Sequence, residues 1–209
     1  NIGRPLAQVA LDRDPAEWIV LEVSSFQLHD THGIVPTIGA VTNLAPDHLD
    51  RYESVDAYYA DKALLFRHAT DASQWIVNAD DAAVMAMVRD VPGTTFRFSA
   101  SGRLCDAFLG GKGKRHLIVH DEMLMTREEL PLLGAHNVGN ALASVLAVLT
   151  ADPAHESLDD LARLAAGLRS FRAPAHRLEP VVEQHGVLWI DDSKATNVAS
   201  AKVAIESMT

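Results

Sequence analysis

Four short apolar runs, each ending in polar residues, constrain the fold more than any other feature of this sequence. "WIVLEVSS" (18–25), "TIGAVTNL" (37–44) and "QWIVNADD" (74–81) are rich in β-branched side chains, and "VLWID" runs directly into "DSKATN". Their apolarity is continuous rather than alternating, which is typical of strands buried on both faces. We therefore expect an α/β protein built on a parallel sheet.

Helical and hairpin patterns lie between and after these runs. The apolar side chains of residues 54–69 suit one face of a helix, and Asn78 or Asp80 is positioned to cap a further helix. Residues 103–119 predict a hairpin with a glycine-rich loop, and residues 136–149 and 157–170 predict two helices.

A change of composition at "FRAPAHR" (171–177) indicates a domain boundary, since a proline there follows a predicted helix. We expect one domain over residues 1–173 and the beginning of a second over residues 174–209. In the second, two strands separated by a turn at Gly186 precede a terminal helix. The chain begins at Asn1 and ends within a helical pattern, so we expect an internal piece of a longer protein.

Composition excludes several classes of function. The chain is 48% hydrophobic with a mean hydropathy of +0.03, and no apolar run approaches the ~18 residues that a membrane span requires. A formal charge of −10 disfavours general binding of nucleic acid or anionic membrane. Cys105 is the only cysteine, so no disulfide can form within the chain, as expected for a cytoplasmic protein.

Two predicted strands end in residues that could bind ligands. Glu22 lies near the end of the first apolar run and is followed by two serines, and the carboxyl ends of parallel strands are where ligands bind. Ser24 or Ser25 could equally cap the next helix. After the second strand, "DHLDR" offers carboxylates and the His48 imidazole for a divalent metal or for proton transfer, or begins a short solvated helix.

Two further stretches are open to either a functional or a structural interpretation. Lys62 lies in a predicted helix, where a lysine is ordinarily solvated. Asn137 and Asn140 follow His136, three residues apart on one helix face, and their amides suit a purine edge or a helix cap. "GGKGKRH" (110–116) looks like a phosphate loop, but Phe108 stands where the first glycine belongs, so a hairpin turn is the better interpretation.

Taken together, six stretches resemble the Mur ligases, the family that builds the peptide of the bacterial cell wall. They are "EVSSFQL", "TNLAPDHLDRY", "YYADKALLF", "GAHNVGNALA", "HRLEPV" and "IDDSKATN", in the order of the family. The resemblance extends from end to end, and "SSFQL" and "DDSKATN" are most similar to the branch that adds D-glutamate. It implies an ATPase-type central domain with a parallel sheet and a small antiparallel hairpin, followed by a Rossmann-like α/β domain.

The resemblance also implies the chemistry. Family members activate a carboxylate with ATP as an acyl phosphate, which an incoming amine attacks. By motif position, Glu22 and His48 resemble ligands of two Mg²⁺ ions. Lys62 resembles a lysine that is carbamylated, which would turn a cation into an oxygen anion of the kind that Mg²⁺ prefers. His48, Lys62 and Lys194 are thereby implied to be catalytic.

Further roles follow from the same motif positions. Asn137 and Asn140 resemble adenine-binding asparagines, and Arg177, Asp192 and Lys194 resemble residues at the phosphates and ribose of ATP. Thr196 resembles a contact of the incoming glutamate, while Asn1, Ser24 and Gln27 resemble contacts of UDP-N-acetylmuramoyl-L-alanine. The resemblance implies a monomer.

The family's phosphate loop and uridine-binding domain have no counterpart in these residues, so we expect that the 209-residue piece alone does not catalyse ligation. Three alternatives remain open: a sister ligase for L-glutamate, diaminopimelate or lysine; a non-catalytic family member that serves as a binding module; and a nucleotide-dependent oxidoreductase. The last is disfavoured because no G-x-G-x-x-G follows a strand.

Overall fold

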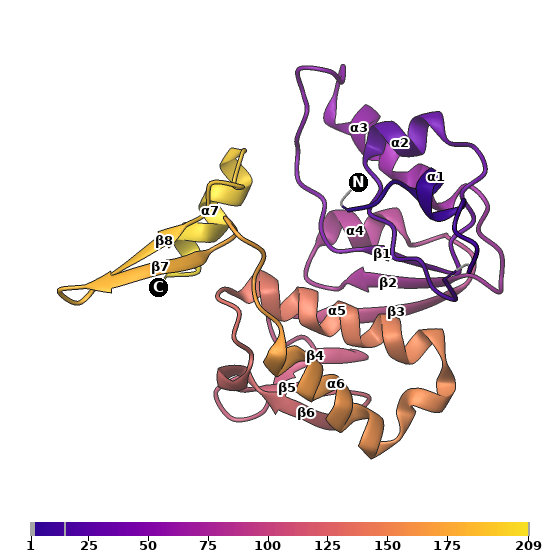
Figure 1. The fold of residues 1–209 in the computed structure, drawn as a ribbon. Helices are drawn as coiled ribbons and strands as arrows, with labels where there is room; N and C mark the ends of the chain where they lie inside the picture. The colour runs from indigo at the N-terminus through magenta and orange to yellow at the C-terminus, as the bar shows by residue number, and fades with distance from the viewer. Residues whose placement is uncertain (1–2, 15, 209) are drawn as a thin grey trace. The chain divides into compact units, whose positions relative to one another are not determined.

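The structure is a computed structural model that describes residues 3–14 and 16–208, and it divides into two compact units. The first unit comprises residues 1–36 and 46–69, and the second comprises residues 37–45 and 70–209. The helices and strands are labelled in Figure 1. In chain order they are α1 (Leu6–Val9), α2 (Ser25–Asp30), β1 (Ile38–Val41), α3 (Val55–Ala63), β2 (Gln74–Asn78), α4 (Ala82–Met87), β3 (Thr94–Ser99), β4 (Ala107–Gly110), β5 (His116–Val119), β6 (Glu122–Thr126), α5 (Ala135–Ala151), α6 (Leu158–Ser170), β7 (Glu179–Gln184), β8 (Val187–Asp191) and α7 (Val198–Glu206), with short 3₁₀ turns at Leu64–Phe66, Arg127–Glu129 and Pro153–Glu156.

The second unit contains a six-stranded sheet in the order β1-β2-β3-β4-β5-β6. The strands from β1 to β4 are parallel, and β4, β5 and β6 form an antiparallel meander. The expected parallel sheet with a small hairpin region is therefore confirmed. The glycine-rich segment 110–116 is the turn between β4 and β5, as predicted, and Gly111 and Gly113 both have the positive φ that such turns favour.

Helix α5 lies against the sheet (Figure 1), and its buried apolar residues form the core of this unit. It contacts the strands from β1 to β5. Close approach requires Gly139, where an added Cβ would lie 3.2 Å from the ring of Phe98 on β3. The α5 residues fully or almost fully buried in this core are Val138, Ala141, Leu142, Val145, Leu146 and Leu149.

Residues 18–24 form no strand, so the prediction for the run 18–25 is wrong. Trp18 and Ile19 are about half exposed, and Val20 is fully exposed. An apolar run becomes a buried strand only when a neighbouring strand pairs with its backbone, and the six-stranded sheet does not include this segment. The helix predicted over 54–69 is confirmed as α3 with the 3₁₀ turn that follows it.

The cap of α4 also differs from the prediction. Asp81, rather than Asn78 or Asp80, is the N-cap, and its Oδ1 accepts hydrogen bonds from the backbone N–H groups of Ala83 and Val84. The Asp80 side chain instead points toward the turn after β3, where it accepts four hydrogen bonds from residues 99–101. Three polar residues within four positions could each cap this helix, and the tertiary hydrogen bonds of Asn78 to Thr42 and of Asp80 to residues 99–101 decide between them.

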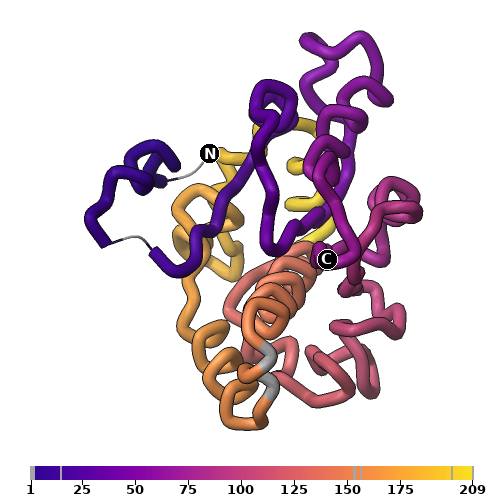
Figure 2. The backbone as a smooth tube through the Cα atoms, turned by 90° about the vertical axis from the view of Figure 1, so that its right-hand side faces the viewer, coloured from indigo at the N-terminus to yellow at the C-terminus, as the bar shows by residue number. Residues whose placement is uncertain are grey.

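After α6 the chain follows an irregular connection through residues 171–178, which can be traced in Figures 1 and 2, to the antiparallel pair β7 and β8. Gly186 has a φ of 77° in the turn between these strands, as expected. Helix α7 begins at its cap Asn197. The domain boundary after residue 173 stays a prediction.

Candidate active site

In the first unit, two of the predicted substrate contacts form a helix cap. Ser24 is the N-cap of α2: its Oγ accepts the N–H of Gln27 at 3.3 Å, and the Gln27 side-chain oxygen accepts the N–H of Ser24 at 2.9 Å. This reciprocal pair fixes both side chains at the start of the helix. Glu22 is exposed two residues before the cap. Asn1 lies outside the described residues.

His48 and Lys62 are brought together by an aromatic cluster. The His48 ring lies 6.3 Å from the ring of Tyr58, centroid to centroid, and the Lys62 ammonium lies 4.9 Å from the centre of the same ring. Tyr58 is buried, and Phe26 and Tyr52 complete the cluster beside it. His48 has a φ of 53°, a left-handed backbone that Asp47 supports by accepting the His48 N–H at 2.8 Å.

The electrostatic setting of Lys62 is unusual for a helical lysine. Burial lowers the pKa of its side chain, and the carboxylate of Asp47 acts in the opposite direction. A lowered pKa increases the fraction of neutral amine at pH 7, and the neutral amine is the nucleophilic form. The same burial raises the pKa of the Tyr58 hydroxyl, and Asp47 adds to that shift.

Asp61 is a residue of this site that sequence reasoning missed. One carboxylate oxygen lies 2.9 Å from Nδ1 of His29, and the other accepts the hydroxyl of Tyr52 at 2.9 Å. The hydrogen bond to Asp61 raises the pKa of His29. Asp61, the α3 residue immediately before Lys62, therefore connects α3 to His29 of α2 and to Tyr52 by hydrogen bonds. Its position next to Lys62 in the sequence was a signal, but its partners are 9 and 32 residues away.

In the second unit, the predicted adenine-binding asparagines lie in the first turns of α5. Asn137 donates from Nδ2 to the carbonyl of Leu133 at 2.7 Å, and Asn140 donates to the side-chain oxygen of Asn137 at 3.3 Å. The helix begins after Gly134, which has no side chain to cap it. Gly134 has a φ of 84°, and an added Cβ would lie 2.3 Å from Oγ of Ser207.

The predicted phosphate and ribose residues are held by hydrogen bonds between two loops. Asp192 accepts the backbone N–H of Leu178 at 3.0 Å, and the N–H of Lys194 donates to the carbonyl of His176 at 3.1 Å. Arg177 is therefore held near Asp192 and Lys194, and the side chains of Arg177 and Lys194 are exposed. Thr196 is exposed just before the cap of α7.

A contact between a histidine and an aspartate lies at the same junction. Nδ1 of His176 lies 2.7 Å from Oδ2 of Asp191, and hydrogen bonds from His176 and Ser193 lower the pKa of Asp191 to about 2. Glu179 is close enough that His176, Glu179 and Asp191 could offer ligand atoms to one metal ion. The hydrogen bond between His176 and Asp191, with the backbone N–H of His176 donating to Glu179, already accounts for this proximity.

Burial also lowers the pKa of His136 at the start of α5, while the carboxylate of Asp192 opposes the shift. The two residues are 56 positions apart in the sequence, so the second unit brings the asparagine helix and the Asp192 loop into electrostatic range of each other.

None of the described helices is both long enough and apolar enough to cross a membrane.

A mostly parallel sheet with helix α5 against it defines an α/β fold, and the carboxyl ends of the parallel strands are the edge where such folds bind ligands. The family model "Mur ligase middle domain" matches residues 1–148. The chain therefore belongs to the Mur ligase family.

Curated relatives support this assignment over the whole chain. The chain is 39% identical over 211 residues to the UDP-N-acetylmuramoylalanine--D-glutamate ligase of Acidobacterium capsulatum, and 37% and 34% identical to the proteins of that name from Vibrio cholerae and Bacillus subtilis. These matches include 99–100% of the chain and 44% of each relative. The chain thus spans less than half the length of the relatives.

Solved structures match the fold at lower identity. MurF from Acinetobacter baumannii matches with a TM-score of 0.62 and 21% identity, over 88% of this chain and 39% of that one. MurF from Thermotoga maritima, solved in complex with ADP, matches with a TM-score of 0.61 and 18% identity, over 88% of this chain and 42% of that one. At this identity the likeness shows the fold.

Proposed function

We propose that the full-length protein is an ATP-dependent ligase that joins D-glutamate to UDP-N-acetylmuramoyl-L-alanine in the synthesis of peptidoglycan precursors. The amino acid specificity rests on the names of the relatives, which are 34–39% identical to this chain. The observation from the structure that supports the mechanism is the half-buried amine of Lys62. It lies over the ring of Tyr58, and the His48 ring packs edge-on against the same ring.

Lys62 fits the carbamylation that the family resemblance implies. The neutral amine attacks carbon dioxide, an N–C bond forms, the nitrogen loses a proton, and the product is a carbamate with one negative charge. A lowered pKa favours the neutral amine that this step requires. Tyr58 provides an apolar wall beside the nitrogen, and Asp61 secures the helix from which Lys62 projects.

The chemistry of the donor set would suit magnesium through its carboxylate and carbamate oxygens. The Glu22 carboxylate, the carbamate of Lys62 and the His48 imidazole would supply two oxygen ligands and one nitrogen ligand to two Mg²⁺ ions. Bound there, the ions would neutralise charge on the γ-phosphate of ATP and on the acyl phosphate that forms. The residues of this chain would orient that site, with the left-handed backbone at His48 directing its imidazole.

The second unit would hold the nucleotide. Asn137 and Asn140 would contact the adenine, because amides offer both donors and acceptors to a purine edge. Arg177, Asp192 and Lys194 would contact the phosphates and ribose, and the hydrogen bonds around His176 hold their loops together. Thr196 would contact the incoming glutamate. Asn1, Ser24 and Gln27 would contact the UDP-sugar substrate.

Residues 1–173 would form most of the central domain, and residues 174–209 would begin the C-terminal domain of a monomeric cytoplasmic enzyme. Closure of the second domain over the nucleotide would bring Lys194 to the acyl phosphate. The expectation that residues 1–209 alone do not ligate stays a prediction, and ligation by the isolated piece would contradict it.

The test is phosphate release from ATP by the full-length protein with UDP-N-acetylmuramoyl-L-alanine. D-glutamate, L-glutamate, meso-diaminopimelate and L-lysine are supplied one at a time. Release with D-glutamate alone supports the proposal, whereas release with another amino acid keeps the ligase mechanism and changes the substrate. If a folded protein that binds ATP releases no phosphate with any of the four, the catalytic assignment is wrong.

A further inference from the structure

Arg127 makes contacts in the second unit that none of the roles above includes. It begins the 3₁₀ turn Arg127–Glu129, which follows β6, and its side chain is half-buried. Burial lowers the pKa of its guanidinium, and the carboxylate of Glu128 acts in the opposite direction. A cation that loses part of its hydration requires hydrogen bonds in return. The acceptors of those bonds therefore indicate what Arg127 stabilises.

Both acceptors lie in the segment that leads from this turn to α5. Nη1 of Arg127 donates to the carbonyl of Leu130 at 3.2 Å, and Nη2 donates to the carbonyl of Leu132 at 2.8 Å. Residues 130–134 belong to neither a helix nor a strand. Backbone groups outside regular structure need other partners, and a planar guanidinium offers several donors in a fixed geometry. Arg127 therefore holds two carbonyls of one short connection.

The side chains of the same connection are anchored in the core. Leu130 is 3% exposed and Leu132 is 8% exposed, and both belong to the apolar cluster that includes the buried face of α5. The leucine side chains fix where the connection lies, and the bonds from Arg127 fix the direction of its carbonyls. These two constraints together restrict the backbone immediately before α5.

The next carbonyl along the chain orients the two asparagines assigned to adenine. The carbonyl of Leu133 accepts Nδ2 of Asn137 at 2.7 Å, and the side-chain oxygen of Asn137 accepts Nδ2 of Asn140 at 3.3 Å. Gly134, at the start of α5, has no side chain to cap the helix, so the path of the chain into α5 depends on the residues before it. The orientation of both amides therefore depends on where the connection places the Leu133 carbonyl.

We propose that Arg127 is a positioning residue for adenine recognition, acting through the backbone of residues 130–133 on the two asparagine amides. Its guanidinium does not contact the nucleotide. It holds the connection, the Leu133 carbonyl orients Asn137, and Asn137 orients Asn140. The inference rests on the proposed role of the asparagines in binding adenine. A site that hydrogen-bonds a purine edge discriminates by geometry, so a displaced amide lowers affinity for the base rather than for the phosphates.

The test is calorimetric titration of the full-length protein with ATP, GTP and inorganic tripolyphosphate, each with Mg²⁺. The wild type should prefer ATP to GTP, because adenine and guanine present different donors and acceptors. R127M removes the donors and keeps an aliphatic side chain. It should bind ATP about tenfold more weakly and tripolyphosphate as the wild type does, so that the preference for ATP falls. A role in stability alone would leave that preference unchanged.

A second variant and a matched control complete the experiment. R127K keeps the charge but replaces the planar fork with one ammonium, so its ATP affinity should lie between those of the wild type and R127M. R115M removes an exposed arginine, whose Nε donates to Glu128 at 2.7 Å, and should bind ATP as the wild type does. Far-ultraviolet circular dichroism verifies folding, and R127K decides the question if R127M is unfolded.

N140A separates failure of this inference from failure of the nucleotide assignment. It should lose the preference for ATP over GTP. If N140A keeps that preference, or if the wild type has none, the assignment of the asparagines is wrong and the inference falls with it. If N140A loses the preference but R127M and R127K keep it, only the role of Arg127 is overturned. Equal weakening of all three ligands in R127M, or the same loss in R115M, would also overturn it.

Discussion

Asp81 joins the start of α4 to the segment after β1, and its replacement tests how the sheet edge is held. Oδ1 accepts the N–H groups of Ala83 and Val84, and Oδ2 accepts the N–H of Leu44 at 2.7 Å. Loss of the cap costs about 1 kcal/mol. Loss of a charge-assisted bond to the N–H of a buried residue costs about 2 kcal/mol more. We therefore expect Asp81→Ala to lower the free energy of unfolding by about 3 kcal/mol.

Asp81→Asn separates the two contributions. Asparagine caps helices as well as aspartate does, so the bonds to Ala83 and Val84 should persist. Its Nδ2 donor would face the N–H donor of Leu44, so that hydrogen bond is lost. We expect a loss of about 2 kcal/mol for Asp81→Asn, and less than about 0.5 kcal/mol for the exposed control Asp90→Ala.

Urea unfolding followed by tryptophan fluorescence measures these differences. Trp75 is 1% exposed on β2 and becomes solvated when the unit unfolds, whereas Trp18 and Trp189 are already 47% and 60% exposed. Amide hydrogen exchange at Leu44 measures the bridge alone. If both Asp81 variants unfold at the wild-type urea concentration, or if the Leu44 amide exchanges equally in all of them, the reasoning fails.

Three further predictions follow. Burial would raise the pKa of Asp80, but hydrogen bonds from Ser101 and Ser99 outweigh it and lower the pKa. Its stabilisation is therefore present above the unfolded pKa and is lost as pH falls through the lower, folded pKa. The urea midpoints of wild type and Asp80→Asn should differ at pH 7 and converge as pH falls below the ordinary carboxyl pKa of 3.8, and a constant difference would contradict this. Leu142→Ala should cost about 3 kcal/mol in urea unfolding, because this fully buried α5 side chain leaves a cavity against the sheet; a loss below about 1 kcal/mol would mean that the core closes around it. In the full-length protein, Lys62→Ala should lower the rate of ATP-dependent ligation by about 10²-fold, with partial rescue by added acetate or formate; unimpaired activity without added carboxylate would remove Lys62 from the mechanism.

The sequence by itself determined the elements whose patterns are local. The apolar runs at β1 and β2, the amphipathic patterns of α5 and α6 and the glycine-rich turn after β4 all form as predicted. Each is specified by side-chain periodicity or by a backbone conformation that glycine favours. The six ordered motifs likewise identified the family, which the match over residues 1–148 confirms.

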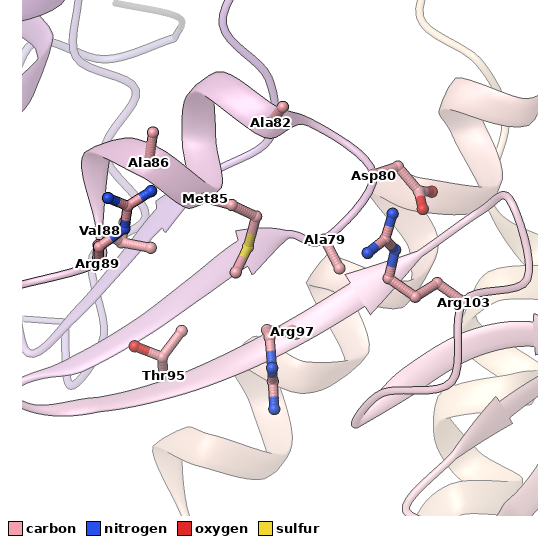
Figure 3. A pocket seen from close by; sticks show the side chains of 10 residues that line it. All are labelled: Ala79, Asp80, Ala82, Met85, Ala86, Val88, Arg89, Thr95, Arg97 and Arg103. Carbon is pink, nitrogen blue, oxygen red and sulfur yellow. The ribbon is translucent and has the colours of Figure 1, made fainter.

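Only the tertiary structure decided the features that depend on partners distant in sequence. The run 18–24 is as apolar as β1 but forms no strand, because a strand requires a paired neighbour and this one lacks it in the six-stranded sheet. Asp81 caps α4 because Asp80 is engaged with the turn at residues 99–101. A hollow beside α4 is lined by residues of three separate segments, 79–89, 95–97 and Arg103 (Figure 3). The sequence determines the charge and the hydrogen-bonding capacity of each side chain, but the packing of the elements determines which side chains come into contact.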